Sequence, residues 1–323
     1  MSSTRRHSFR AIGIDVGGTK IAAGIVQFPG GRLLRRQIVA SNIRHGGRKT
    51  LDEVVNLAQQ LADESTEHGH PPRAIGLGIC ELIDPSGILL SQNCLRWSRL
   101  PVQERLGEIA PTLLEADVRA AAIGEALWGA GKPYRSFLYI TIGTGISCCL
   151  MIDGRPFLGA HGATGTIGSS PLPNLDRLTS KKSSTSLEEF ASGPGLVARY
   201  NRRHRSTPVD SGPEVFRAAQ KGDADAQEII RSGAFAVGAV VGGLVNLLDP
   251  EAVIVGGGLG LRRGLYRNTL ITAARQHIWW PGHRHVSIQS AALAADAGII
   301  GAATVAAQIF PTTGRRLSIR VTP

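Results

Sequence analysis

The sequence is poor in cysteine and aromatic residues, and it lacks a long apolar run. Four cysteines occur in 323 residues, and no two of them have a CxxC spacing. Cys148 and Cys149 are adjacent, so on a strand they would point to opposite faces and are poorly placed to pair. A reduced, cytoplasmic location is therefore expected.

Two further absences limit the classes of protein to consider. No stretch of 18 apolar residues occurs, which argues against a membrane span. The first ten residues carry arginines but no apolar segment, so a secretory signal peptide is not expected.

The charge is one-sided, but its pattern does not indicate nucleic-acid binding. The formal net charge is +11, yet the basic residues are scattered, and the four tyrosines and four tryptophans do not alternate with them. A basic surface also suits an anionic nucleotide. We therefore expect neither a nucleic-acid nor a membrane partner.

Glycine is abundant within an otherwise ordinary globular composition. The chain has 40 glycines, 42% hydrophobic residues and 19% charged residues. Many glycines separate short apolar runs, which is typical of tight turns between strands and loops. The length allows two domains.

Two segments share the order strand, glycine corner, strand. They are residues 11–27 (AIGIDVGGTKIAAGIVQ) and 137–153 (FLYITIGTGISCCLMID). Alternating elements follow each segment, so the pattern predicts an α/β fold in which one unit is duplicated to give two lobes. We also expect helices over 49–69, 116–131, 187–202, 213–248 and 295–310, a short helix within 101–114, and strands over 29–42, 74–83, 112–116, 252–260 and 286–293.

The first glycine corner has the composition of a phosphate-binding turn. Backbone N–H groups at Gly17 and Gly18 can approach phosphates closely, and Thr19, next to Lys20, adds a hydroxyl donor. Asp15, at the strand end, can hold hydrated Mg²⁺. The alternative is an ordinary hairpin.

Two later glycine segments strengthen the phosphate interpretation. Thr144 and Gly145 belong to a second corner in the second lobe. Gly256, Gly257 and Gly258 follow a buried strand, where a nucleotide could lie against bare backbone. Three such segments in order predict a bound nucleotide, whereas each alone is weak evidence.

Three further segments carry a family pattern, namely EADVRAAAIGEALWGAG, LLDPEAVIVGGG and ADAGIIGAA. Together with the glycine corners, they resemble the ROK family of sugar kinases and repressors, within the actin-like ATPase superfamily. The resemblance runs from about residue 11 to residue 308. It implies two ribonuclease-H-like lobes with an active-site cleft between them, ATP and Mg²⁺ as cofactors, γ-phosphoryl transfer to a sugar hydroxyl, and a homodimer.

The resemblance also implies the division of the chain. Residues 1–117 and 297–323 would form an N-terminal lobe, and residues 118–296 a C-terminal lobe that binds nucleotide and dimerises. The repressor branch carries an N-terminal helix-turn-helix, for which the ten or so residues before the first strand are too few.

The catalytic aspartate of the family lies in an Asn-Asp-Ala motif at a helix start. Ala116, Asp117 and Val118 match that motif. The resemblance makes Asp117 the base that accepts the proton of the attacking hydroxyl. The alternative is that Asp117 is a helix N-cap. Ala116 replaces the asparagine that contacts the sugar in the family.

The expected sugar pocket departs from the family. The pattern Gly-Glu-x-Gly-His aligns with residues 165–169, where Thr166 and Ser169 replace the Glu and the His. These hydroxyls could bond a substrate but lack charge. The cysteine-rich zinc block aligns with PNLDRLTSKKSSTSLEEFASG, which has no cysteine, so we expect no structural zinc.

Three more residues are candidate substrate contacts. Glu188 aligns with a sugar-contacting glutamate of the family, with a capping box after Thr185 as the alternative. Glu81 stands where the family has the glycine of a Pro-Gly pair, and could accept from a hydroxyl, pair with an amine, or face solvent. Asn93 completes the set.

The changed pocket predicts a changed substrate, because buried polar groups left unpaired are strongly penalised. The first hypothesis is a kinase for a primary hydroxyl of a modified hexose or a C7-cyclitol of the valiolone type. An aminohexose such as kanosamine is a close alternative, and glucose is the third. A regulatory protein that binds ATP without turnover is an alternative of another class.

Overall fold

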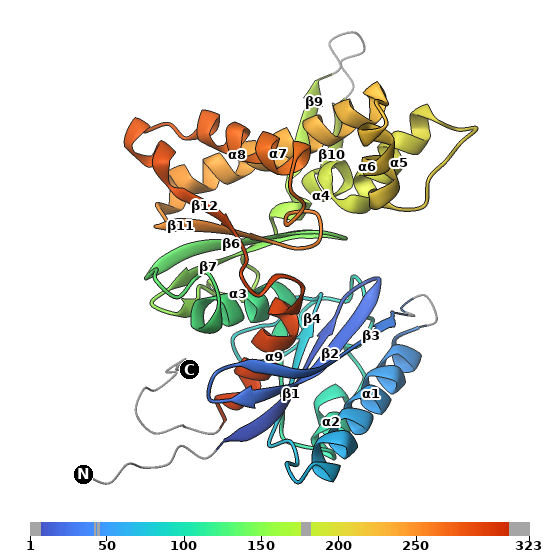
Figure 1. The fold of residues 1–323 in the computed structure, drawn as a ribbon, viewed down its shortest axis with the longest axis vertical. Helices are drawn as coiled ribbons and strands as arrows, with labels where there is room; N and C mark the ends of the chain where they lie inside the picture. The colour runs from blue at the N-terminus through green and yellow to red at the C-terminus, as the bar shows by residue number, and fades with distance from the viewer. Residues whose placement is uncertain (1–7, 42, 44–45, 176–181, 310–323) are drawn as a thin grey trace. The chain divides into compact units, whose positions relative to one another are not determined.

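The computed structural model describes residues 8–41, 43, 46–175 and 182–309. The chain forms two compact units. Unit 1 comprises Met1–Arg135, Met151–Thr164 and Ala295–Pro323, and unit 2 comprises Ser136–Leu150 and Gly165–Ala294. In the colours of Figure 1, unit 1 contains the blue strands and the red helix α9, whereas unit 2 contains the yellow and orange helices.

Unit 1 is built on a five-stranded sheet in the order β3-β2-β1-β4-β5. β1, β2 and β3 pair antiparallel, while β4 and β5 continue the sheet parallel to β1. The expected hairpin of residues 11–27 is confirmed as β1 and β2. The strands are β1 (Phe9–Val16), β2 (Lys20–Phe28), β3 (Arg32–Ala40), β4 (Ile75–Ile79) and β5 (Thr112–Ala116).

One face of this sheet packs on α1 (Gly47–Glu67) and α2 (Val102–Gly107). Because side chains on a strand alternate between faces, every second residue of β1 contributes to this core. The cluster joins Ile12, Ile14 and Val16 to the apolar face of α1. Most of the apolar residues whose spacing predicted a helix over 49–69 are buried in α1, which confirms that prediction.

The other face packs on α9 (Ala297–Ala307), which in turn contacts α3 (Asp117–Trp128). Glycines allow this close packing. A side chain at Gly13 or Gly76 would overlap backbone carbonyls of α9, and one at Gly301 would overlap the backbone of α3. Since α3 packs on α9, it belongs to unit 1, so the expected lobe boundary after residue 117 lies too early.

Unit 2 repeats the pattern around a sheet in the order β12-β11-β6-β7-β8. β11 pairs parallel with both β6 and β12, as β4 does with β1 and β5. This repetition confirms the duplicated α/β architecture. The strands are β6 (Ser136–Ile142), β7 (Ile146–Ile152), β8 (Arg155–Pro156), β11 (Ala252–Gly256) and β12 (Ser287–Ser290), and the contacts of β8 group it with unit 1.

The helical layer of unit 2 is more divided than the sequence pattern suggested. The helix expected over 187–202 is two helices, because Ser192 caps a new one at Gly193. The helix expected over 213–248 breaks at Gly222, which has φ +96°. A helix between 261 and 286 was missed. The helices are α4 (Leu187–Ala191), α5 (Gly193–Arg203), α6 (Gly212–Gln220), α7 (Ala224–Leu248) and α8 (Leu265–His277).

Two features of unit 2 were not expected from the sequence. β9 (Pro171–Leu175) and β10 (Lys182–Ser186) form an antiparallel pair within the segment that aligns with the zinc block of the family. α7 is long and apolar enough to cross a membrane, but it packs along α8, and half of its most apolar window is buried inside the unit. The helix is therefore explained as a core helix.

Candidate functional site

Unit 1 gathers its candidate catalytic groups at the carboxyl ends of three parallel strands. Register places Asp15 of β1 beside Gly78 of β4, and Ile79 beside Ala116 of β5. A side chain at Gly78 would lie 3.6 Å from the Cα atom of Asp117, so β4 passes directly beside it. Ligand sites in α/β folds form at this edge of a sheet.

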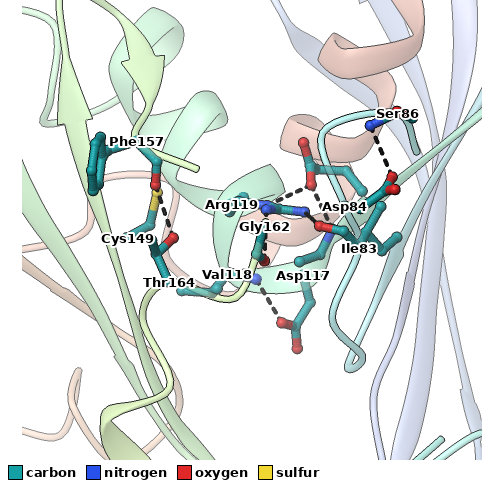
Figure 2. A network of polar contacts seen from close by, with 12 residues as sticks. Ile83, Asp84, Ser86, Asp117, Val118, Arg119, Cys149, Phe157, Gly162 and Thr164 are labelled. Atoms are coloured by element: carbon teal, nitrogen blue, oxygen red, sulfur yellow. Dashed lines mark hydrogen bonds and ion pairs between the residues drawn. The ribbon is translucent and has the colours of Figure 1, made fainter. Parts of the chain in front are cut away.

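Asp117 is the first residue of α3, and Ala116 occupies the N-cap position. The Asp117 carboxylate accepts from the backbone N–H of Val118 at 2.6 Å, the short contact that Figure 2 draws below the helix end. The N-cap of α3 is therefore Ala116, and the alternative prediction that Asp117 is the N-cap is wrong. The positive end of the helix dipole favours a carboxylate here.

Asp15 lies beside the glycine corner and close to the start of α9. Burial raises the pKa of its carboxyl to about 6, against the opposing effect of the Lys20 charge. A side chain at Gly298, at the start of α9, would lie 2.5 Å from Asp15 Cγ. The corner itself closes with Gly17 donating to the Lys20 carbonyl at 3.0 Å, and Thr19 beside it is exposed.

Arg119, which the sequence analysis missed, organises the surroundings of Asp117. Its side chain is buried and donates to the Glu115 carboxylate at 2.7 Å, to the Ile83 carbonyl at 2.6 Å and to the Gly162 carbonyl at 3.3 Å. Figure 2 shows these bonds leaving one guanidinium for three segments. The sequence shows only an arginine two residues after the expected base, which does not indicate these partners.

Glu81 does not have the environment that the sequence suggested. Its side chain is only 5% exposed, so it does not face solvent. Its carboxylate accepts from the hydroxyl of Ser91 and from the backbone N–H groups of Asn93, Cys94 and Leu95. These bonds occupy both oxygens, which leaves the expected pairing with a substrate amine without a basis.

In unit 2, the second and third glycine segments are in contact. Leu259 and Gly260 donate to the Ile142 carbonyl at 2.9 and 3.0 Å. A side chain at Gly257, which has φ +78°, would overlap the backbone of Ile142. The loop after β11 therefore lies against the corner after β6, and a side chain at Gly258 would meet only open space.

A further segment joins these turns and was missed by the sequence analysis. Gly193, the first residue of α5, donates to the Gly143 carbonyl at 2.9 Å. The N-terminus of α5 therefore lies at the same corner as Thr144, whose side chain is exposed, and Gly145. The Ser-Gly-Pro-Gly run that starts α5 was the signal that could have identified it.

Glu188 lies against the same corner. Its Oε2 atom accepts from the backbone N–H of Ile146 at 2.8 Å and lies 2.8 Å from where a side chain at Gly145 would begin. The capping box of α4 is made by Ser186 and Glu189, so the alternative of a cap by Glu188 after Thr185 is wrong.

Thr166 is the N-cap and Ser169 the last residue of a short helical turn, η2 (Ile167–Ser169), which brings Gly168 close to Glu188. Both side chains are exposed. The structure therefore places these candidate substrate residues at the end of unit 2 that also carries the glycine turns.

No group of three or more His, Cys, Asp or Glu side chains that could hold a metal occurs among the described residues. The segment aligned with the zinc block includes residues 176–181, which lie outside them.

Comparisons with known proteins show which family the chain resembles in sequence and fold. A glucokinase of Streptomyces coelicolor is 29% identical over 93% of this chain and 98% of its own length. The crystal structure of a ROK family glucokinase from Streptomyces griseus with glucose and AMPPNP has a TM-score of 0.79 at 28% identity, covering 93% and 99% of the two chains. A ROK hexokinase from Thermus thermophilus has a TM-score of 0.74 at 32% identity, covering 92% and 98%. The model of the ROK family matches residues 11–309, and the chain belongs to the ROK family.

Proposed function

We propose that this protein is an ATP-dependent kinase that phosphorylates a hydroxyl group of a small sugar or sugar-like polyol, with Asp117 as the general base. The observation that carries the proposal is the placement of Asp117 at the start of α3, at the strand edge that also holds Asp15. The glucokinases among its relatives support the same activity.

Asp117 fits the role of a base. The positive end of a helix dipole favours the charged form of a carboxylate, and an ionised carboxylate can accept the proton of a hydroxyl within hydrogen-bonding distance. Arg119 is two residues away and holds the neighbouring loops by their carbonyls, so the base is attached to a rigid support. Rigid placement of the base is what phosphoryl transfer asks of the protein.

The residues present also fit Mg²⁺ and ATP. Asp15 offers a carboxylate oxygen of the kind that hydrated Mg²⁺ prefers, beside a corner in which Gly17 and Gly18 lack side chains. In unit 2, a side chain at Gly258 would meet only open space, so the backbone there is accessible beside the corner that holds the start of α5. When bound, ATP supplies the γ-phosphoryl group, and Mg²⁺ neutralises part of the phosphate charge.

The candidate substrate residues support a proposal for the substrate class. Thr166 and Ser169 replace a Glu and a His that contact hexose in the family, so a C7-cyclitol or a modified hexose is our first candidate. Glucose is the second, because the relatives named above are glucokinases. An aminohexose loses the observation that favoured it, since the carboxylate of Glu81 is already occupied.

A coupled ADP-release assay tests the proposal. The purified protein, ATP and Mg²⁺ are combined with glucose, N-acetylmannosamine, kanosamine and a valiolone-type cyclitol, with Asp117→Asn as the control. Acceptor-stimulated ADP release that Asp117→Asn abolishes supports the kinase. ATP binding without stimulation by any acceptor would favour the regulatory alternative. A cytoplasmic location and a homodimer stay predictions.

A further inference from the structure

The carboxylate of Glu81 has an unusual set of partners for a residue beside a candidate active site. Oε2 accepts from the Ser91 hydroxyl and from the Asn93 N–H at 3.0 Å. Oε1 accepts from the N–H groups of Cys94 and Leu95 at 2.6 and 2.8 Å. All four donors come from one short loop, residues 91–95.

This loop has no regular secondary structure that could satisfy the same donors. Buried backbone N–H groups need partners, and a carboxylate that accepts several of them organises the backbone around itself. The loop is also fixed at its far end, where Trp97 is 1% exposed and donates to the Gly47 carbonyl at 2.8 Å. The path of residues 91–97 is therefore set from both sides.

The side chain of Asn93 is left outside this network. Its backbone N–H is held by Glu81, while its side chain is exposed and has no hydrogen bond within the described part of the chain. Glu81 itself follows β4, the strand that passes beside Asp117. An amide with both a donor and an acceptor is thus presented from a loop rooted at the catalytic strand edge.

We infer that Glu81 is a positioning residue for substrate recognition, which holds the 91–95 loop in the shape that lets Asn93 bind the acceptor polyol. The inference rests on the proposed kinase function. It assigns to Glu81 an indirect role in place of a direct contact with the substrate. Recognition of the acceptor hydroxyls then depends on a carboxylate that the acceptor never touches.

The hydrogen-bond geometry requires that both side-chain oxygens of Glu81 accept hydrogen bonds. Each oxygen of the carboxylate receives two donors, so replacing either oxygen by the NH₂ of glutamine sets a donor against donors. Glu81→Gln therefore breaks up to two of the four bonds while hardly changing the volume of the side chain. Ser91→Ala removes one of the four bonds to the carboxylate, together with the bond that the Ser91 hydroxyl accepts from the Leu82 N–H, and leaves the three backbone bonds to Glu81 in place.

A matched control exists in unit 2. Glu214 also accepts backbone N–H bonds, from Asp210 at 2.7 Å and from Ser211 at 3.3 Å, at the start of α6. Glu214→Gln makes the same chemical change at a carboxylate whose hydrogen-bond partners, Asp210, Ser211 and Arg217, are not candidate site residues. It reports the general cost of neutralising a carboxylate that accepts backbone bonds.

The experiment combines steady-state kinetics with amide hydrogen exchange on the full-length variants. Glu81→Gln is expected to raise KM for the acceptor by about tenfold or more, the scale of one charged hydrogen bond, and to change KM for ATP less than about twofold. Amides of residues 93–95 should exchange faster than in the wild type. Ser91→Ala should show smaller shifts of the same kind, and Glu214→Gln neither.

Two results would overturn the inference. One is faster exchange of the loop with an unchanged acceptor KM, since the loop would then be held for stability alone. The other is unchanged exchange in the loop. If Glu81→Gln does not fold, Ser91→Ala decides the matter by the same two readouts. Absence of acceptor-stimulated turnover in the wild type would refute the kinase instead, and exchange at 93–95 would still test whether Glu81 holds the loop.

Discussion

The guanidinium of Arg119 in α3 donates to the carboxylate of Glu115 in β5, four residues earlier, and both groups lie mostly out of solvent, at 4% and 17% side-chain exposure. Burial raises the pKa of Glu115, and the charge of Arg119 opposes that shift. The same guanidinium holds the Ile83 and Gly162 carbonyls. One buried pair thus supports both loops near Asp117.

Replacing Arg119 alone should lower the stability of the fold. Arg119→Met leaves Glu115 without its partner and is expected to lower the free energy of unfolding by about 3–5 kcal/mol. Urea unfolding measures this change. The double variant Arg119→Met with Glu115→Gln should lose less than the two single variants together, because no unpaired charge remains. Additive losses would show that the pair is not coupled.

Replacing the proposed base should remove turnover and spare the fold. Asp117→Asn keeps the size of the side chain but cannot take the proton, so kcat is expected to fall about 100-fold or more. The acceptor and ATP KM values and the melting temperature should stay near those of the wild type. Turnover close to wild type would exclude Asp117 as the base.

A methyl group at Gly298 should disturb Asp15 without touching any ligand. It would overlap the Asp15 carboxylate, so Gly298→Ala is expected to raise the KM for MgATP several-fold. Gly243→Ala is the matched control, because Gly243 lies in α7 with nothing within 4 Å of an added methyl. That change should be neutral or stabilise the helix by up to about 1 kcal/mol. Equal kinetics in the two variants would contradict a nucleotide role for Asp15.

The N-cap of α7 should make stability depend on pH. Asp223 accepts from Ala226 N–H and from the Tyr200 hydroxyl, and these bonds lower the pKa of its carboxyl below the usual 3.8. A lowered folded-state pKa means that the unfolded chain binds more protons, so this contribution is present above about pH 4.

The contribution of Asp223 should therefore disappear as the pH falls through the folded-state pKa. Asn still caps a helix but carries no charge, so Asp223→Asn should be less stable than the wild type at pH 6, and the difference should shrink towards pH 3. Thermal melts across that range measure it. A difference independent of pH would show that the charge of Asp223 contributes nothing.

The sheet of each unit could be predicted because its signals are local. Apolar runs broken by Asp15-Val16-Gly17-Gly18 and by Thr141–Gly145 indicate hairpins whatever surrounds them, and both hairpins formed. The helical breaks at Gly193 and Gly222 were missed, since a glycine inside an apolar pattern is compatible with either a continuous or an interrupted helix.

The roles of the charged residues were harder to predict from the sequence than the sheets. Nothing in the neighbourhood of Glu81 along the chain indicates that its partners lie 10 to 14 residues away, and Arg119 carries no local sign that it binds Ile83 and Gly162. A carboxylate beside a substrate and a carboxylate that holds a loop have the same sequence signal. Only the position of the donors separates the two.

The sequence by itself determined the duplicated α/β architecture, the family and the position of Asp117, because glycine corners, strand patterns and a helix start are encoded within a few residues. Only the tertiary structure decided that Glu81 and Arg119 are buried, and which atoms the side chains of Glu81, Arg119 and Glu188 bond. Burial and hydrogen bonding depend on segments distant in the chain that meet only when the sheets are packed.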